Sequence, residues 1–194
     1  MKKYRDHYFH KAKQDQYPAR SVYKLQDMDR RFKLFRKGQN VLDLGAAPGS
    51  WSLYAAKKAG PQGRVLAVDL AHVETAFPDN VLFVQSDIRD PSQVLLTELQ
   101  HRTPFDLVIS DMAPQTTGIK LRDQAKSLEL AELAMAMAQQ HMAPEGVFVA
   151  KVFQGPDVPD FIVNLRRTFQ KVKTFKPKSS RAESKESFVL GFGL

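Results

Sequence analysis

The sequence contains no cysteine, and this absence excludes several classes of chemistry. Disulfide bonds, thiolate-bound metals and mechanisms with a cysteine nucleophile all require that residue. No apolar run reaches the 18 residues of a membrane-spanning helix, so we expect no transmembrane segment. The first residues lead into no apolar stretch, so we expect no secretory signal, and the missing cysteine fits a reducing compartment, the cytoplasm.

Paired metal ligands are also missing from the sequence. The histidines show no paired spacing on an expected helix, so no metal site is predicted. They are His7, His10, His72, His101 and His141. A chain of 194 residues has the length of one domain, and we expect one over residues 1–194, with residues 1–19 forming a basic, aromatic-rich arm that orders only in part.

Positive charge is concentrated at the two ends of the chain. The formal net charge is +8. Residues 1–40 carry 12 Lys and Arg against 4 Asp and Glu, residues 41–165 carry 9 against 15, and residues 166–194 carry 8 against 2. Basic ends around an acidic middle favour a polyanionic partner such as RNA, although a solvated, solubilising surface has the same composition.

Short apolar runs alternate with helical patterns from residue 41 onward. Continuous apolar strands separated by helices indicate a mostly parallel sheet with helices on both faces. The expected strands cover residues 41–44, 65–68, 81–84, 107–109, 147–150, 172–175 and 187–192, and the expected helices cover 20–32, 51–59, 91–99, 121–142 and 158–169. Only a loop separates the last two strands, so we predict an α/β fold with seven strands and an antiparallel last strand.

Two expected helices have informative positions. Val22, Leu25 and Met28 recur on one side of the helix over residues 20–32, and Lys24 falls on another face. Pro91 is expected in the first turn of the helix over residues 91–99, where its missing N–H costs little.

Polar residues lie at or just beyond the carboxyl ends of five of the expected strands. Ligands of open α/β sheets bind at the carboxyl ends of the strands. One charged residue in this position is often a helix cap or a solvated loop, but five strands in succession indicate a ligand site. The residues are Asp43 with Gly45, Asp69, Asp87, Asp111 and Lys151.

The first of these strand ends has the character of a nucleotide-binding turn. Glycines in the turn over residues 43–49 allow the backbone to approach a ligand closely. Asp69 follows Gly45 by 24 residues, the position of a carboxylate that binds a ribose diol, and Asp87 lies where an adenine edge is expected. Ala47 replaces the glycine that admits a pyrophosphate, which favours S-adenosylmethionine over the alternative, NAD.

Several segments, in order along the chain, resemble the FtsJ/RlmE-type family of RNA ribose 2′-O-methyltransferases. They are residues 20–25, 43–51, 111–114, 151–153 and 179–186. The resemblance implies a Rossmann-like methyltransferase fold that uses S-adenosyl-L-methionine. It also implies a catalytic tetrad of Lys24, Asp111, Lys151 and Glu186. The cofactor contacts that it implies are Gly45, Pro48, Gly49, Trp51, Asp69, Asp87, Ile88 and Asp111.

Two positions bear on how closely the sequence matches the family pattern. Ser50 stands where a third small glycine is common in relatives, at a helix start that tolerates serine. Glu183 lies three residues before Glu186, and a shift of that size would exchange the two acids.

The tetrad has a chemical rationale. A ribose hydroxyl is a poor nucleophile until its proton is removed, and a lysine is a base only when neutral. We therefore expect Lys151 to act as the general base, oriented by Asp111 and Glu186. Lys24 would position the hydroxyl or contact phosphate, and it would supply the neighbouring cation that favours a neutral Lys151.

The acceptor and the partner are also predicted. Cytosine C5 methylation needs a thiolate, and Gln115 stands where base-amine methylases carry a stacking aromatic, so an oxygen of the sugar is favoured. Resemblance to compact bacterial members implies a uridine of 23S ribosomal RNA in the large ribosomal subunit, bound by a monomer. The alternatives are a tRNA ribose, a non-catalytic RNA-binding assembly protein and a small-molecule methylase.

RNA contacts are expected at both basic ends. Cations and aromatics alternate over residues 4–20, which suits looped or single-stranded RNA, and cations recur from Lys171 to Arg181. We expect the two stretches to converge on one rim around the methyl donor. The alternative is that the aromatics only pack the arm onto the domain.

Overall fold

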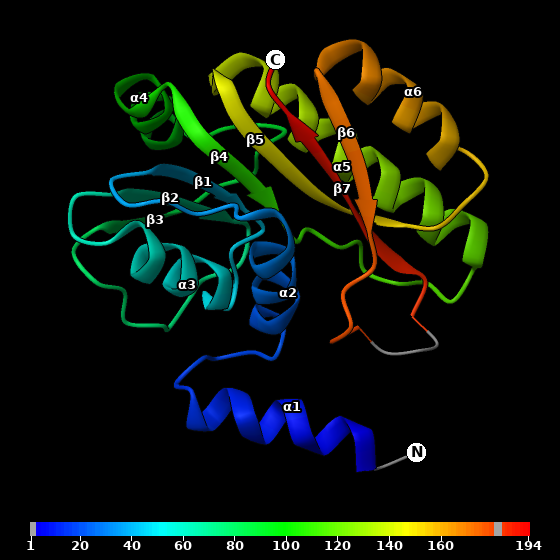
Figure 1. Ribbon diagram of the computed structural model, residues 1–194, viewed down its shortest axis with the longest axis horizontal. Helices are drawn as coiled ribbons and strands as arrows, with labels where there is room; N and C mark the ends of the chain where they lie inside the picture. The colour runs from blue at the N-terminus through cyan, green and yellow to red at the C-terminus, as the bar shows by residue number, and fades with distance from the viewer. Residues whose placement is uncertain (1–2, 181–183) are drawn as a thin grey trace.

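One twisted sheet of seven strands organises the chain (Figure 1). The computed structural model describes residues 3–180 and 184–194, with side chains from residue 7 onward. The strands are β1 (Asn40–Leu44), β2 (Arg64–Asp69), β3 (Val81–Gln85), β4 (Phe105–Ser110), β5 (Met142–Phe153), β6 (Lys171–Phe175) and β7 (Glu186–Phe192). Their order is β3-β2-β1-β4-β5-β7-β6, and β7 runs antiparallel to β5 and β6, whereas the other neighbouring strands are parallel to each other. The predicted α/β fold is confirmed.

Helices cover both faces of this sheet, as expected. They are α1 (Lys3–Gln14), α2 (Val22–Phe32), α3 (Ser50–Ala59), α4 (Gln93–Arg102), α5 (Lys120–His141) and α6 (Val158–Thr168). Buried side chains of α2 and α3 form one core cluster with one face of the sheet. Those of α4, α5 and α6 form a second cluster with the other face.

The period of two along each strand decides which face a side chain joins. On β5, Val149 joins the α2 side and Phe148 joins the α5 side, so Lys151 continues the α2 side. The same alternation assigns Asp111 to the face of Ile109 and Glu186 to the face of Phe188. Three residues of the expected tetrad therefore share the sheet face that α2 covers.

The amino-terminal arm contains a helix that the sequence pattern did not predict. Residues 3–14 form helix α1. Ala12 is buried, and the ring of Tyr8 lies 5.2 Å from that of Tyr23 on α2. Burial of these apolar surfaces offsets the low helix propensity of a polar, charged segment.

Two helix boundaries also differ from the pattern. Pro91 precedes α4 instead of occupying its first turn, because Ser92 is the N-cap and its hydroxyl accepts from the backbone N–H of Leu95 at 3.3 Å. Strand β5 begins at Met142, directly after α5 and earlier than the apolar run at 147–150 predicts, because Met142 pairs with Phe105 on β4.

Candidate active site

The turn between β1 and α3 brings the backbone close to the end of β4. The N–H groups of Gly45 and Ala46 both donate to the carbonyl of Val68, at 2.9 and 3.1 Å. Gly45 has a φ of +79°, and a Cβ built on it would lie 2.6 Å from Cγ of Met112. Only glycine fits this conformation and this approach.

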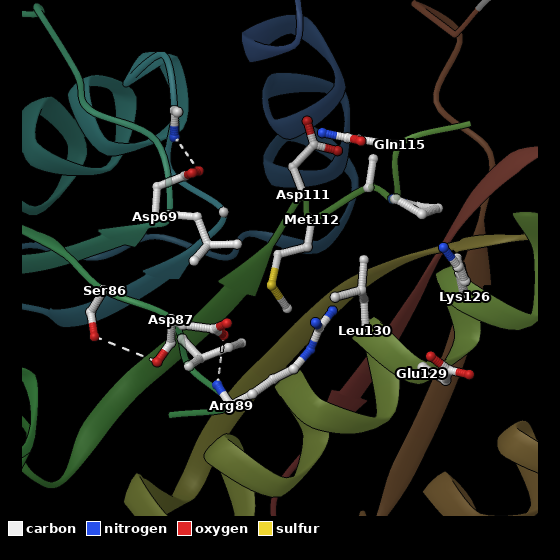
Figure 2. A pocket seen from close by; sticks show the side chains of 16 residues that line it. Asp69, Ser86, Asp87, Arg89, Asp111, Met112, Gln115, Lys126, Glu129 and Leu130 are labelled. Atoms are coloured by element: carbon white, nitrogen blue, oxygen red, sulfur yellow. Dashed lines mark hydrogen bonds between the residues drawn. The ribbon is translucent and has the colours of Figure 1, made fainter. Parts of the chain in front are cut away.

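A cavity of about 660 Å³ opens beside this turn, at the carboxyl ends of β1 to β4 (Figure 2). Five of the predicted cofactor residues line it: Gly45, Asp69, Asp87, Ile88 and Asp111. Other lining residues were not predicted: Ala47, Leu70, Ser86, Arg89, Met112, Ala113, Pro114, Gln115, Lys126, Glu129 and Leu130. The spacing of the last three residues, which places them on one face of α5, is the sequence signal that could have found part of this wall.

Asp69 is fixed at the rim of this cavity by backbone donors. Its Oδ2 accepts from the N–H of Ala47 and its Oδ1 from the N–H of Ala71, both at 2.8 Å. Each carboxylate oxygen keeps a free lone pair, so the side chain can still accept from two hydroxyls of a ribose. Asp87 is oriented in the same way by the N–H of Arg89 at 2.9 Å. This arrangement fits an adenosine group.

Three other residues were predicted to contact the cofactor but do not line the cavity: Pro48, Gly49 and Trp51. Trp51 is buried against Phe188, and its Nε1–H donates to the carbonyl of Ser21 on the segment before α2 at 3.0 Å. Thr75 packs over the turn, donating from its hydroxyl to the carbonyl of Pro48 at 2.6 Å. At Gly49, with a φ of +108°, a Cβ would lie 2.9 Å from the ring of Phe77.

Lys151 and Asp111 form a buried pair where β4 and β5 end. The Lys151 Nζ donates to Oδ1 of Asp111 at 2.9 Å and to its backbone carbonyl at 2.6 Å. The Lys151 side chain is only 6% exposed. Two contacts to one residue define the position of the ammonium nitrogen more tightly than an ion pair alone would.

Lys24 and Glu186 form a second, separate pair. The Lys24 Nζ on α2 lies 2.7 Å from Oε2 of Glu186 at the start of β7. A cavity of about 450 Å³ adjoins this pair. Its lining residues are Ala19, Arg20, Ser21, Lys24, Ser179, Ser184 and Glu186. Glu183, the alternative acid, lies outside the described residues.

The two pairs belong to one electrostatic site. Burial raises the pKa of Glu186, but Lys24, the Ser180 hydroxyl and Lys151 outweigh this effect and leave it below its ordinary value of 4.5. In the antiparallel ladder Lys151 faces Phe188 and Glu186 faces Phe153, so Lys151 and Glu186 are diagonal neighbours on one face. The structure thus brings all four residues of the expected tetrad to one edge of the sheet.

A further carboxyl group lies beneath the site. Asp43 is fully buried, its Oδ2 accepts from the Ser52 hydroxyl at 2.6 Å, and its Oδ1 has no hydrogen-bond partner. The pKa of Asp43 is raised to about 7, mainly by burial; the Ser52 hydrogen bond acts in the opposite direction, and the charges of Asp111 and Asp69 add to the rise. The sequence marked Asp43 as a strand end but gave no signal for its burial or for Ser52.

The basic stretches converge only in part. Arg20 donates to the carbonyl of Ser179 at 2.9 Å, so the segment after β6 does adjoin the start of α2. Lys176 and Lys178 belong to this segment. Lys171, however, begins β6, which runs parallel to β5, and therefore lies at the opposite edge of the sheet. Arg181 lies outside the described residues.

Residues 3–180 and 184–194 contain neither a cluster of metal ligands nor a membrane-spanning helix. No group of three or more His, Asp or Glu side chains in this part of the chain could hold a metal ion. Among the same residues, no helix has the length and apolar character needed to cross a bilayer.

Comparison with known proteins agrees with this geometry. A family model described as FtsJ-like methyltransferase matches residues 17–194. A protein of Nitratidesulfovibrio vulgaris (strain DP4), named ribosomal RNA large subunit methyltransferase E, is 59% identical over 100% of this chain and 95% of its own length. A protein of the same name from Oleidesulfovibrio alaskensis is 57% identical over 100% of this chain and 94% of its own length.

Solved structures agree as well. A crystal structure described as a ribosomal RNA methyltransferase from Plasmodium falciparum has a TM-score of 0.77 at 26% identity, covering 92% of this chain and 98% of that one. The family model and the full-length relatives together show that this chain belongs to the FtsJ-like methyltransferase family.

Proposed function

We propose that this protein methylates a ribose 2′-hydroxyl of RNA with S-adenosylmethionine, and that its substrate is a uridine of 23S ribosomal RNA in the large ribosomal subunit. The observation that carries the proposal is the meeting of two lysine–carboxylate pairs beside a cavity suited to adenosine. Relatives at 57–59% identity are named ribosomal RNA large subunit methyltransferase E, which supports the choice of substrate.

The residues around the larger cavity fit the cofactor. Asp69 would accept from the ribose hydroxyls, Asp87 would face the adenine, and Gly45 leaves room for close approach. When bound, S-adenosylmethionine supplies a methyl group made electrophilic by its sulfonium. Because a sulfonium carries positive charge, the carboxylates at this edge also favour its binding.

Lys151 is the group placed to take the proton of the ribose hydroxyl. Its Nζ is buried and held at a defined position by Asp111. After this amine has lost its own proton, it can accept the proton of a ribose hydroxyl bound within hydrogen-bond reach. Once Lys151 holds the proton, the Asp111 carboxylate at 2.9 Å stabilises the resulting ammonium. Asp111 therefore serves both orientation and charge balance.

Lys24 and Glu186 would position the ribose from the other side. Glu186 holds Lys24 in place and carries negative charge at neutral pH, since its pKa is lowered. A lysine ammonium fixed in this way can donate to the 2′-oxygen or to a neighbouring phosphate. The cavity of about 450 Å³ next to this pair provides the space for the incoming strand.

One assay tests the proposal directly. The purified protein is incubated with methyl-labelled cofactor and, separately, with large ribosomal subunits, naked ribosomal RNA and tRNA, and the RNA is digested to nucleosides. We expect labelled 2′-O-methyluridine from large subunits. Label in tRNA would move the substrate to tRNA, label on a base would refute the ribose acceptor, and no transfer to any RNA would refute the enzymatic function.

A further inference from the structure

The first turn of α5 presents an unusual exposed surface. Four consecutive residues, Ile119, Lys120, Leu121 and Arg122, are exposed, and we call them the α5 tip. Ile119 is 60% exposed and Leu121 is 67% exposed. Large apolar side chains in this state contribute little burial energy to the fold.

The α5 tip also conflicts with what a helix start requires. Its N-cap is Ile119, which makes no side-chain capping bond. Lys120 and Arg122 place positive charge at the positive end of the helix dipole, where acidic residues are favoured. None of these four residues stabilises the start of the helix. Their presence therefore suggests a role in binding another molecule.

The α5 tip is nevertheless firmly held. Asp123 is buried, and its carboxylate accepts from the N–H and the hydroxyl of Thr117, both at 2.8 Å, and from the N–H of Gly118 at 3.2 Å. Gly118 has a φ of +82°, which lets the chain turn into the helix. The exposed side chains therefore project from a preorganised turn, which lowers the entropic cost of binding.

The α5 tip lies at the edge that carries the reactive groups. Lys120 lines a cavity of about 210 Å³ together with Phe153 and Lys185, and Phe153 faces Glu186 in the β5–β7 ladder. Farther along the same helix, Lys126 and Glu129 line the cofactor cavity. The start of α5 lies beside the start of β7 in Figure 1.

We propose that the α5 tip is a contact surface for the substrate RNA close to the methylated nucleotide. Apolar side chains that alternate with cations suit a polynucleotide, because bases and sugars offer apolar faces between phosphates. Ile119 and Leu121 pack against bases or sugars, while Lys120 and Arg122 neutralise phosphates. This inference rests on the proposed function, since it assigns part of that site's substrate recognition.

The test compares two double variants at apolar side chains that are all exposed, by 46% to 67%. Ile119→Ser with Leu121→Ser removes the apolar part of the α5 tip. The control is Val94→Ser with Leu96→Ser on α4, where no lysine or arginine lies within four residues of either position in the sequence. We expect the first variant to raise KM for large subunits about tenfold, with kcat, cofactor affinity and melting temperature unchanged, and the control to match wild type.

Two further measurements identify the partner. Lys120→Gln with Arg122→Gln should lower the slope of log affinity against log salt by about 1.4 to 1.8, the value for two released counterions. A photo-crosslinking amino acid in place of Leu121 should attach to ribosomal RNA in the particle.

The possible outcomes separate this inference from the proposed function. If wild type methylates RNA and the Ile119 and Leu121 variant matches it in KM, the contact surface is refuted and the proposed function stands. Crosslinks to a ribosomal protein alone would refute RNA as the partner. If wild type transfers no methyl group, the proposed function fails first.

Discussion

Ion pairs differ between the edge of the sheet where the parallel strands begin, the amino edge, and the edge where they end, the carboxyl edge. At the amino edge, Arg36 pairs with Asp106, and these side chains are 66% and 26% exposed. At the carboxyl edge, Lys151 pairs with Asp111, and these side chains are 6% and 16% exposed. An exposed pair contributes little to stability, whereas a buried pair costs desolvation energy that the fold must offset. In the proposed mechanism the charges buried at the carboxyl edge carry out the proton transfer, which accounts for a pair that stability alone would not favour.

The largest expected effect comes from a comparison in which the cation of each ion pair is removed in turn. Lys151→Ala should lower kcat by about 10³-fold or more, since no other base is placed at its position. Arg36→Ala should leave turnover unchanged and alter the free energy of unfolding by less than about 0.5 kcal/mol. Single-turnover assays, with cofactor affinity as the check on folding, measure both. Near-normal turnover in Lys151→Ala would show that the carboxyl edge does not work as described.

The pH dependence of the free energy of unfolding tests the cost of burying the Asp43 carboxyl group at the carboxyl edge. Since burial raises the pKa of Asp43 from 3.8 to about 7, the folded chain retains a proton that the unfolded chain releases in this range. The stability of wild type relative to Asp43→Asn should therefore fall as pH rises from about 4 to about 7, by up to about 4 kcal/mol. Urea unfolding across this range measures it, and parallel stability curves for the two proteins would contradict the prediction.

The contribution of the Lys24–Glu186 pair to stability should change with pH in the opposite direction to that of Asp43. The pKa of Glu186 is lowered, so its contribution to stability is complete above its ordinary value of 4.5 and is lost as pH falls through the lower folded value. Glu186→Gln should therefore differ most from wild type near neutral pH, by about 1 kcal/mol, and converge with it in acid. It should also lower kcat about tenfold, because Lys24 loses its anchor. Glu98→Gln, in a partly exposed pair on α4, is the matched control and should leave kcat unchanged.

The smallest expected effect concerns the attachment of the amino-terminal arm to this edge. The Ser50 hydroxyl accepts from the N–H of Ala19 at 2.7 Å and donates to its carbonyl at 3.2 Å. Ser50→Gly should cost about 1 kcal/mol in urea unfolding and loosen residues 15–21, as seen by faster amide exchange. Unchanged exchange at Ala19 would mean that other contacts, such as Trp51 to Ser21, hold the segment alone.

Some residues of the site could be placed from the sequence, and others could not. Strand ends carrying Asp69, Asp87 and Asp111 were predictable, because period and length define strands and parallel strands end at one edge. The positions of Trp51 and Gly49 were harder to predict. Trp51 turns toward Ser21, and Phe77 packs close to Gly49, because segments distant in sequence fill these spaces.

The positions of the strands along the chain, the glycine turn and the acids at the strand ends were written into the sequence, because they follow from local periodicity and backbone sterics. Only the tertiary structure decided that Lys24 meets Glu186 across 162 residues, that Asp43 is sealed from water and that Ile119 and Leu121 remain outside the core. Burial and pairing depend on which surfaces pack together, and no local pattern of residues encodes that choice.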